Sequence, residues 1–159
     1  MLSINVLCVG KIKEKYLKEA LLEYSKRVSK YCNLNIIEVQ DEKVPDKLSD
    51  KIIENIKDIE AEKMSKYIKK DTCLIALDLN GKELSSEEFS KEIENISLNN
   101  SSITFIIGGT LGISRKILDK CDKKVCFSKM TFPHQLIRVF LLEQIFRGFK
   151  ISNGETYHR

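Results

Sequence analysis

Short apolar runs and segments of helical periodicity alternate along almost the whole chain. Runs of strand length occupy residues 2–10, 34–39, 73–79, 102–107 and 124–127. The segments between them repeat apolar residues every three or four positions and predict helices over residues 14–31, 49–68, 85–96 and 114–120, with a last helix over 135–150. Strands that alternate with helices are typical of a mostly parallel sheet with helices on both faces. The pattern therefore predicts an α/β fold, and a length of 159 residues suits one domain, 1–159, with a proper core.

Local signals fix several of these boundaries. Ser49 is in position to cap the second helix, and Ser85 with Glu88 forms a capping-box pattern at the start of the third. The dipeptide Asn80-Gly81 predicts a turn that ends the third strand. Residues 40–48 are charged and contain a proline, so we expect an exposed loop there.

Apolar residues lie around nearly the whole circumference of the last predicted helix. They are Leu136, Ile137, Val139, Phe140, Leu141, Leu142, Ile145, Phe146 and Phe149. A helix that covers one face of a small sheet needs only one apolar stripe. The excess predicts burial on a second side, which a two-fold homodimer would supply. The alternative is a helix wedged deep in the core of its own chain.

Composition and charge narrow the possible functions without choosing one. The charged fraction is 31%, the hydrophobic fraction is 42%, and the formal net charge of +4 permits an RNA partner but does not demand one. Arginine supplies only five of the 27 basic residues. Because arginine suits bidentate recognition better than lysine, the arginines are the better candidates for specific roles.

The five cysteines and two histidines form no recognisable set of metal ligands, since no Cys-x-x-Cys occurs. The cysteine number is also odd, so we expect neither a structural metal nor a disulfide framework. No stretch approaches a membrane span, and the N-terminal apolar run lacks the basic region of a signal peptide. These features predict a cytoplasmic protein.

Residues 103–112 carry the strongest functional signal. A β-branched and aromatic run leads directly into Gly108-Gly109, and Gly112 follows before the next helix. Ligands of open α/β proteins bind at the carboxyl ends of strands, and glycines there indicate close approach of backbone to something. We therefore expect a side chain at position 108 to occupy the space of a ligand; the alternative is a plain tight turn. The spacing matches neither a Walker A loop nor a dinucleotide fingerprint, which disfavours a dehydrogenase-like enzyme.

Residues 127–134 form a second candidate element. They mix apolar and small polar side chains, and Pro133 restricts Phe132 to an extended conformation, so the segment cannot be helical. We expect a shaped loop whose backbone groups bind a flat heterocycle, with a simple connector as the alternative. His134, close to a helix start, is either a base or a structural histidine.

The residues Tyr157-His158-Arg159 form a third candidate element at the C-terminal tail. An aromatic ring, an imidazole and a guanidinium in succession suit stacking on bases and contact with phosphates. Tails of this kind also fray, and the residues alone leave both interpretations open.

Several of these segments together resemble one known family. The matching residues are Val9-Gly10-Lys11, Ala76-Leu77-Asp78 with Gly81-Lys82, Ile107-Gly108-Gly109 with Gly112, residues 127–134, Arg138-Val139 and Tyr157-His158-Arg159. The chain is similar over its full length to the ribosomal large-subunit pseudouridine N3-methyltransferases of the knotted SPOUT superfamily. The resemblance implies a trefoil knot in the C-terminal third and a homodimer with its sites at the subunit interface.

The same resemblance implies S-adenosylmethionine as the cofactor. The residues that would bind it are Leu77, the glycine pair Gly108 and Gly109, and the segment Phe127, Ser128, Lys129, Met130, Thr131 and Phe132. The implied reaction is methylation of N3 of a pseudouridine in helix 69 of 23S rRNA, with the assembled ribosome as substrate. The N3 proton must be lost, and the candidates for a base or an anion-stabilising donor are His134, Tyr157, His158 and Arg159, with roles unassigned. The competing function is a non-catalytic module that binds RNA or the ribosome on the same fold.

Overall fold

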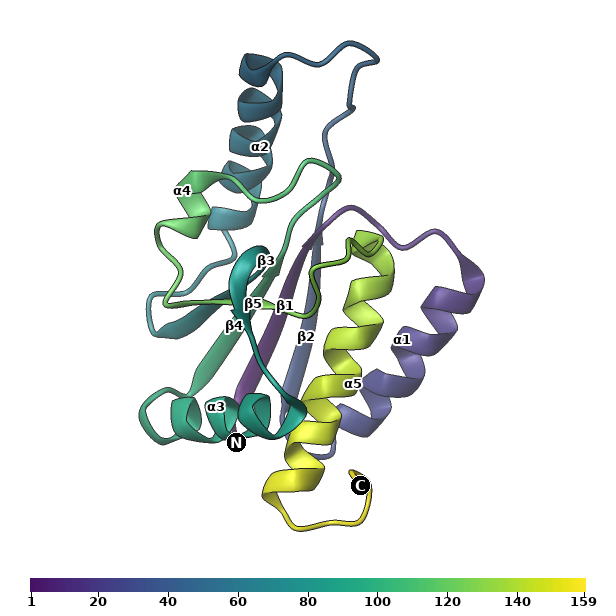
Figure 1. The fold of residues 1–159 in the computed structure, drawn as a ribbon, viewed down its shortest axis with the longest axis vertical. Helices are drawn as coiled ribbons and strands as arrows, with labels where there is room; N and C mark the ends of the chain where they lie inside the picture. Colours follow the sequence, from purple (N-terminus) through teal and green to yellow (C-terminus); the bar gives the residue numbers. More distant parts are fainter.

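The computed structural model describes residues 1–159 and contains one five-stranded sheet. Its strands are β1 (Ser3–Val9), β2 (Asn33–Val39), β3 (Thr72–Glu83), β4 (Ser102–Ile107) and β5 (Lys123–Cys126), in the spatial order β2-β1-β4-β3-β5 (Figure 1). Every neighbouring pair is parallel, so the carboxyl ends of all strands lie at one edge of the sheet. The predicted α/β fold is confirmed, with a sheet that is wholly rather than mostly parallel.

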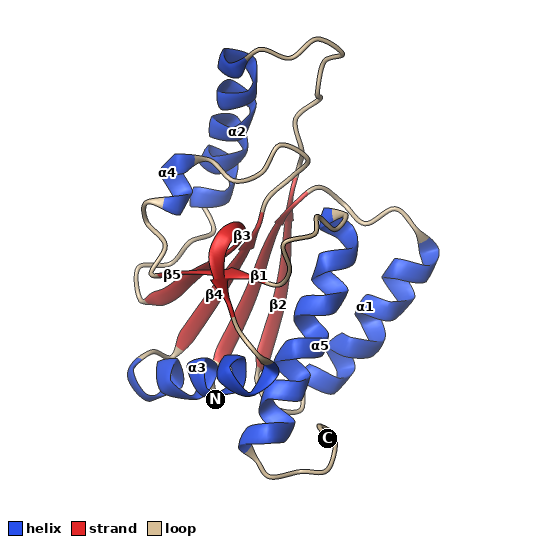
Figure 2. Cartoon of the chain, in the orientation of Figure 1, coloured by secondary structure: helices blue, strands red, loops and turns tan.

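Helices cover both faces of the sheet (Figure 2). One face packs against α1 (Lys15–Val28), α3 (Ser86–Asn99) and α5 (His134–Ser152), and the other against α2 (Asp50–Ser65) and the short α4 (Arg115–Leu118). The period of two along β1 divides its side chains between the layers: Ile4 and Val6 join the core under α5, whereas Leu7 joins the core under α2. The sheet is therefore buried on both sides, as a parallel sheet requires.

The predicted helix starts at Ser49 and Ser85 are confirmed by their hydrogen bonds. The Ser49 hydroxyl accepts from the Ile52 N–H at 3.2 Å. The Ser85 hydroxyl accepts from the Glu88 N–H at 3.1 Å, and the Glu88 carboxylate accepts from the Ser85 N–H at 2.7 Å, which completes the capping box. Residues 40–48 contain no helix or strand, as predicted.

The predicted turn at Asn80-Gly81 is wrong. Strand β3 continues through these residues to Glu83, and its pairing shifts so that Leu77 and Lys82 both lie opposite Val125. The extra residues form a bulge that bends the strand back over β5. Gly81 allows this close approach, because an added Cβ would lie 2.7 Å from the backbone of Val125. Gly81 thus marks a close contact with β5 at a point where the strand bends but does not end.

Helix α5 lies between α1 and α3 on the sheet, and its own chain covers most of its apolar surface. Leu141, Leu142 and Ile145 are 0% exposed, and the Phe149 ring stacks on Tyr31 at 5.4 Å between centroids. Phe140 is the exception, at 36% exposed. The wedged helix therefore explains most of the apolar excess, and the homodimer stays a prediction that rests on the surface around Phe140.

No helix combines the length and the apolar character that a membrane crossing needs.

Candidate functional site

A cavity of about 470 Å³ opens at the carboxyl ends of β3, β4 and β5. Three stretches of chain line it: residues 77–79 of β3, residues 107–113 after β4, and residues 125–134 without Lys129, with Ile137 of α5 behind them. The structure thus brings Leu77, Gly108, Gly109 and most of the segment 127–132 to one place. Lys129 is exposed and lies outside the lining.

The glycine loop after β4 is a tight turn and a cavity wall at once. The Gly112 N–H donates to the Gly109 carbonyl at 3.1 Å, and Gly112 has a φ of 93°, which favours glycine. A Cβ on Gly108 would lie 2.8 Å from the Gly112 carbonyl carbon and 2.8 Å from Ile113 Cγ1. The expectation that such a side chain would fill ligand space is therefore wrong, because it would collide with the loop itself.

The wall formed by residues 127–133 is an ordered loop between β5 and α5. The Ser128 hydroxyl accepts from the Met130 N–H at 3.1 Å, and the Cys126 thiol donates to the Ser128 carbonyl at 3.0 Å. At its far end the Phe132 ring packs edge-on against Phe140 of α5, with centroids 5.3 Å apart. The loop is thus held from both sides, and its position depends on where α5 begins.

His134 is the first residue of α5 and lies between two cavities. It lines the large cavity, and it also lines a neighbouring one of about 130 Å³ with Asp41, Glu60 and Thr110. Burial and the charge of Arg138 lower the pKa of His134 below its usual value, while Asp41 opposes them. A lowered pKa favours the neutral imidazole at pH 7, which is the form that can accept a proton.

Glu60 of α2 brings a buried carboxylate to the smaller cavity. It is 4% exposed, and its Oε2 accepts from the Glu42 N–H at 3.0 Å. Burial raises the pKa of Glu60. A Cβ on Gly109 would lie 3.2 Å from Glu60 Oε1, so Gly109 packs directly against this side chain. Sequence reasoning missed Glu60, because a glutamate on a charged amphipathic helix gives no sign of burial.

The tail residues lie away from the large cavity in the same chain. The Tyr157 hydroxyl donates to Glu143 Oε2 at 2.9 Å, and Arg147 lies over its ring at 4.6 Å from the centroid. His158 pairs with Glu87 at 2.7 Å. Glu143 is nine residues along α5 from His134, or about 14 Å at 1.5 Å per residue. The tail is therefore folded back on α5 instead of frayed, and one chain does not bring it to His134.

The charge of the large cavity limits which ligands fit it. Its lining contains one carboxylate, Asp78, and no lysine or arginine. Hydrophobic side chains and the backbone of the glycine loop make up most of the rest. Phosphate groups are usually bound by Arg or Lys side chains together with helix N-termini. The N-terminus of α5 reaches this cavity, but no lysine or arginine side chain accompanies it. The cavity therefore favours a flat, partly apolar ligand with a positive charge over a phosphorylated nucleotide.

The chain is similar to known proteins over its whole length. The family model described as "Predicted SPOUT methyltransferase" matches residues 2–158. Two relatives are named ribosomal RNA large subunit methyltransferase H. The protein from Clostridium kluyveri is 57% identical to this chain and the one from Clostridium tetani is 56% identical, each over 99% of this chain and 100% of its own length. A solved structure, that of a probable methylase family protein from Haemophilus influenzae Rd KW20, matches with a TM-score of 0.56 at 11% identity, over 98% of this chain and 70% of that one. The last likeness is one of fold alone.

Proposed function

We propose that this chain, which belongs to the SPOUT methyltransferase family, methylates a ribosomal RNA base. The proposed target is N3 of a pseudouridine in helix 69 of 23S rRNA, on the assembled ribosome. That the protein is a ribosomal RNA methyltransferase rests on its 57% and 56% identity, over the full length, to proteins of that name. The cavity at the strand ends supports binding of the methyl donor, because its walls are segments that the resemblance assigns to the cofactor. The target base in helix 69 is proposed from the family resemblance. A ribosomal substrate also implies a cytoplasmic protein.

The cavity fits S-adenosylmethionine, which supplies an electrophilic methyl group when it is bound. A volume of about 470 Å³ is in the usual range for small-molecule sites. Leu77, Phe127 and Phe132 offer apolar surface to an adenine ring, and the backbone of residues 107–112 offers hydrogen bonds. Asp78 provides a negative charge for the cationic end of the molecule. Lys129 takes no part in this proposal, because it lies outside the lining.

The protein's chemical task is to orient the target base and to accept the N3 proton. A neutral His134 at the edge of the cavity has the position and the protonation state of a general base. Holding the methyl group and N3 in line supplies much of the remaining rate enhancement. We assign the tail residues Tyr157, His158 and Arg159 to contacts with the RNA.

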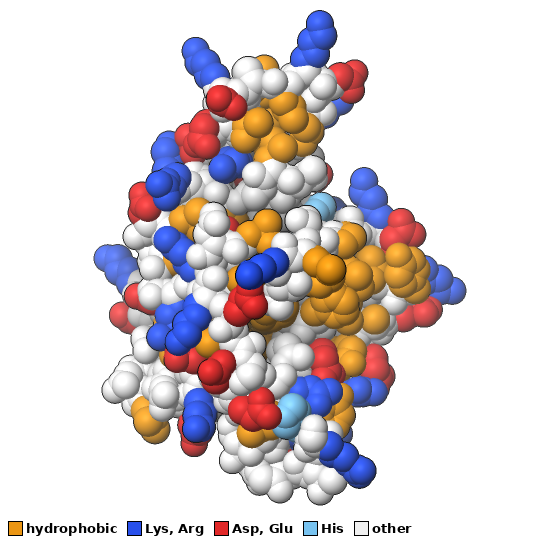
Figure 3. All heavy atoms as spheres, in the orientation of Figure 1, with side chains coloured by type: hydrophobic (Ala, Val, Ile, Leu, Met, Phe, Trp, Pro, Cys, Tyr) orange, Lys and Arg blue, Asp and Glu red, His pale blue; other side chains and the backbone are white.

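A homodimer would unite the two parts of this site. In one chain the tail binds Glu143, which lies about 14 Å along α5 from His134 at 1.5 Å per residue. On this proposal, the tail that reaches the cavity therefore comes from a second chain. Phe140 is exposed and packs on Phe132 beside the cavity, and Figure 3 shows hydrophobic side chains gathered over the upper parts of α5 and α1. We propose that a second copy of the chain covers this surface and brings its tail to the cavity. The trefoil knot stays a prediction of the family resemblance.

In vitro methylation tests the proposed function. Ribosomes from a strain without the enzyme are incubated with the protein and S-adenosylmethionine, and the rRNA is mapped by mass spectrometry. One added methyl group on a helix 69 pseudouridine is the expected result. Calorimetry with S-adenosylmethionine alone distinguishes the competing function, because a non-catalytic binding module would lack affinity for the cofactor.

A further inference from the structure

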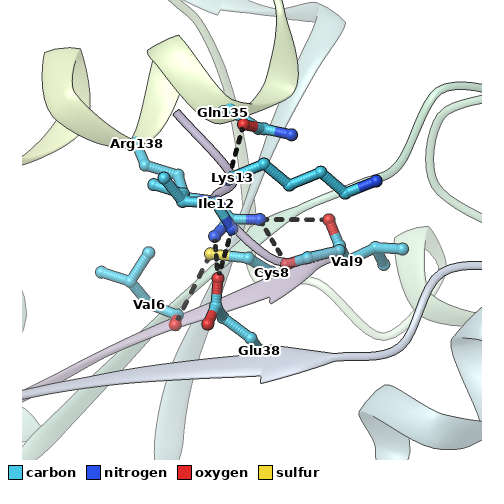
Figure 4. Close-up of polar contacts among 9 residues, drawn as sticks. Val6, Cys8, Val9, Ile12, Lys13, Glu38, Gln135 and Arg138 are labelled. Atoms are coloured by element: carbon cyan, nitrogen blue, oxygen red, sulfur yellow. Dashed lines mark hydrogen bonds and ion pairs between the residues drawn. The ribbon is translucent and has the colours of Figure 1, made fainter. Parts of the chain in front are cut away.

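Arg138 is the largest side chain that is completely buried, at 0% exposed, although it carries a charge. Its Nη1 donates to Glu38 Oε2 at 2.7 Å, and its Nη2 donates to the carbonyl oxygens of Val9 at 3.2 Å and Gly10 at 2.7 Å (Figure 4). Its Nε is buried and has no hydrogen-bond partner. A buried charge is costly unless every donor is paired, and a hydrophobic residue of similar size often stabilises a fold as well. Stability alone is therefore a weak reason for an arginine here.

The contacts of Arg138 join the beginning of α5 to the ends of β1 and β2. Glu38 accepts a second hydrogen bond, from the Ile12 N–H at 3.0 Å, so the same carboxylate holds the segment after β1. Gly10 has a φ of 91°, a conformation that favours glycine, and its carbonyl accepts from the guanidinium. The guanidinium thus fixes the beginning of α5 against the ends of β1 and β2, at the same edge of the sheet as the cavity.

His134 is one helical turn before Arg138, so its position depends on the same contacts. A Cβ on Gly10 would lie 3.5 Å from His134 Nε2 and 3.9 Å from Asp41 Cγ. The imidazole therefore lies beside the turn whose carbonyl binds Arg138. Any shift of the first turn of α5 would move both the imidazole and the loop that forms one cavity wall.

We infer that Arg138 is a positioning residue for methyl transfer and acts through His134. With Glu38 as its counterion, it fixes the imidazole between the two cavities and sets the electrostatic potential at the ring. The inference rests on the proposed function for the role in transfer. The placement of His134 by Arg138 does not depend on that function and can be tested in the protein without substrate.

The charges that face His134 come from several elements. Among them, Arg138 and Glu38 have opposite signs and so should move the pKa of His134 in opposite directions. Arg138 on α5 lowers the pKa of His134, and Asp41 after β2 raises it. Glu42, Lys43 and Glu60 also line the small cavity. At the nearby buried Cys8 the two charges act in opposite directions, because Arg138 lowers the pKa of that thiol and Glu38 raises it. We expect the same opposition at His134. Loss of either partner breaks the same ion pair, but the charge left near His134 differs in sign.

Two substitutions exploit this difference. Arg138→Met removes the positive charge, so the pKa of His134 should rise. Glu38→Gln leaves Arg138 without its counterion, so the pKa of His134 should fall. If Arg138 is merely structural, the two variants should move the titration in the same direction or leave it unchanged.

The measurement is an NMR titration of the histidine rings in the full chain. The protein has only two histidines, and a His158→Gln variant assigns the second signal, so His134 can be followed directly. Arg147→Met is a matched control: it makes the same substitution on the same helix and breaks the Arg147–Glu143 pair nine residues further along. It should leave the His134 titration unchanged.

The second readout is the pH dependence of methyl transfer to ribosomes. Its acid limb should move to higher pH in Arg138→Met and to lower pH in Glu38→Gln, because only the neutral imidazole accepts the proton. Misplacement of the imidazole should also reduce kcat, by up to about a hundredfold, with little change in KM for S-adenosylmethionine.

Each outcome decides one part of the inference. Titrations that shift in the same direction, or not at all, would overturn the role of Arg138 at His134. Opposite titration shifts with unmoved rate profiles would overturn its role in transfer. A wild-type protein that methylates no ribosome would instead refute the proposed function, and the NMR result would still stand. If Arg138→Met does not fold, the isosteric Glu38→Gln decides the question, since Glu38 is partly exposed, at 33% of its side chain.

Discussion

Asp78 is the one carboxylate among the residues that line the large cavity, and loss of its charge should weaken a cationic cofactor selectively. S-adenosylmethionine has a sulfonium charge, which its demethylated product S-adenosylhomocysteine lacks. The two molecules are otherwise nearly identical in shape and in hydrogen-bonding groups. We expect Asp78→Asn to reduce affinity for S-adenosylmethionine and to change affinity for the product little.

The magnitude follows from the size of the cavity. A volume of about 470 Å³ corresponds to a sphere about 10 Å across, which places a charge on the wall on the order of 7 Å from a bound sulfonium. At that distance Coulomb's law gives about 0.6 kcal/mol with the dielectric constant of water and about 2.4 kcal/mol with an effective value of about 20. The expected loss of affinity is therefore roughly threefold to sixtyfold.

Isothermal titration calorimetry with both molecules measures this difference. Asp46→Asn, in the exposed loop 40–48, is the matched control, because it removes the same charge far from the lining and should change neither affinity. Equal losses for the two molecules in Asp78→Asn would refute the electrostatic argument. So would equal effects of the two substitutions, which would show that net charge matters instead of position.

Three further predictions concern the cavity wall, the dimer and the tail. Gly108→Val should abolish cofactor binding and also destabilise the fold by about 1–3 kcal/mol, since its Cβ would lie 2.8 Å from Gly112; thermal denaturation checks this, and a fully stable variant would contradict it. Phe140→Glu should convert a dimer to a monomer, because each copy loses on the order of 1.5–3 kcal/mol of apolar burial; an unchanged mass in sedimentation would exclude this interface. Deletion of residues 157–159 should leave S-adenosylmethionine affinity within about twofold and reduce methyl transfer about tenfold to hundredfold, with Tyr157→Phe as the control for the lost Glu143 contact; full activity would contradict the assignment of the tail to RNA contacts.

The fold could be predicted from the sequence because its signals are local and agree with one another. The apolar run of β1 and the helix caps at Ser49 and Ser85 need only neighbouring residues, and they predict the right elements to within a few positions. The last helix was predicted over 135–150 and runs over His134–Ser152. The bend in β3 escaped prediction because Asn80-Gly81 has the chemistry of a turn, and only contact with β5 decides otherwise.

The polar contacts of the site could not be predicted, because they join residues far apart in the chain. Arg138 and Glu38 are 100 positions apart, and neither stands in a pattern that indicates pairing. An arginine inside a strongly apolar helix was the available signal, since such a charge must find a partner. Glu60 gave no comparable signal, and its burial follows only from the packing of α2 against the glycine loop.

Helix α5 connects all parts of the proposed site, which gives its unusual composition a physical reason. Its first turn carries His134 and is fixed to the strand ends by Arg138, while its middle exposes Phe140 toward the proposed second copy. Its second half holds the tail through Glu143 and Arg147. A helix that must be rigid in its own chain and also contact another copy needs apolar residues on nearly every side, with polar groups only where they bind something. The apolar excess in the sequence therefore has two causes that act together: the wedged helix and, on our proposal, the dimer.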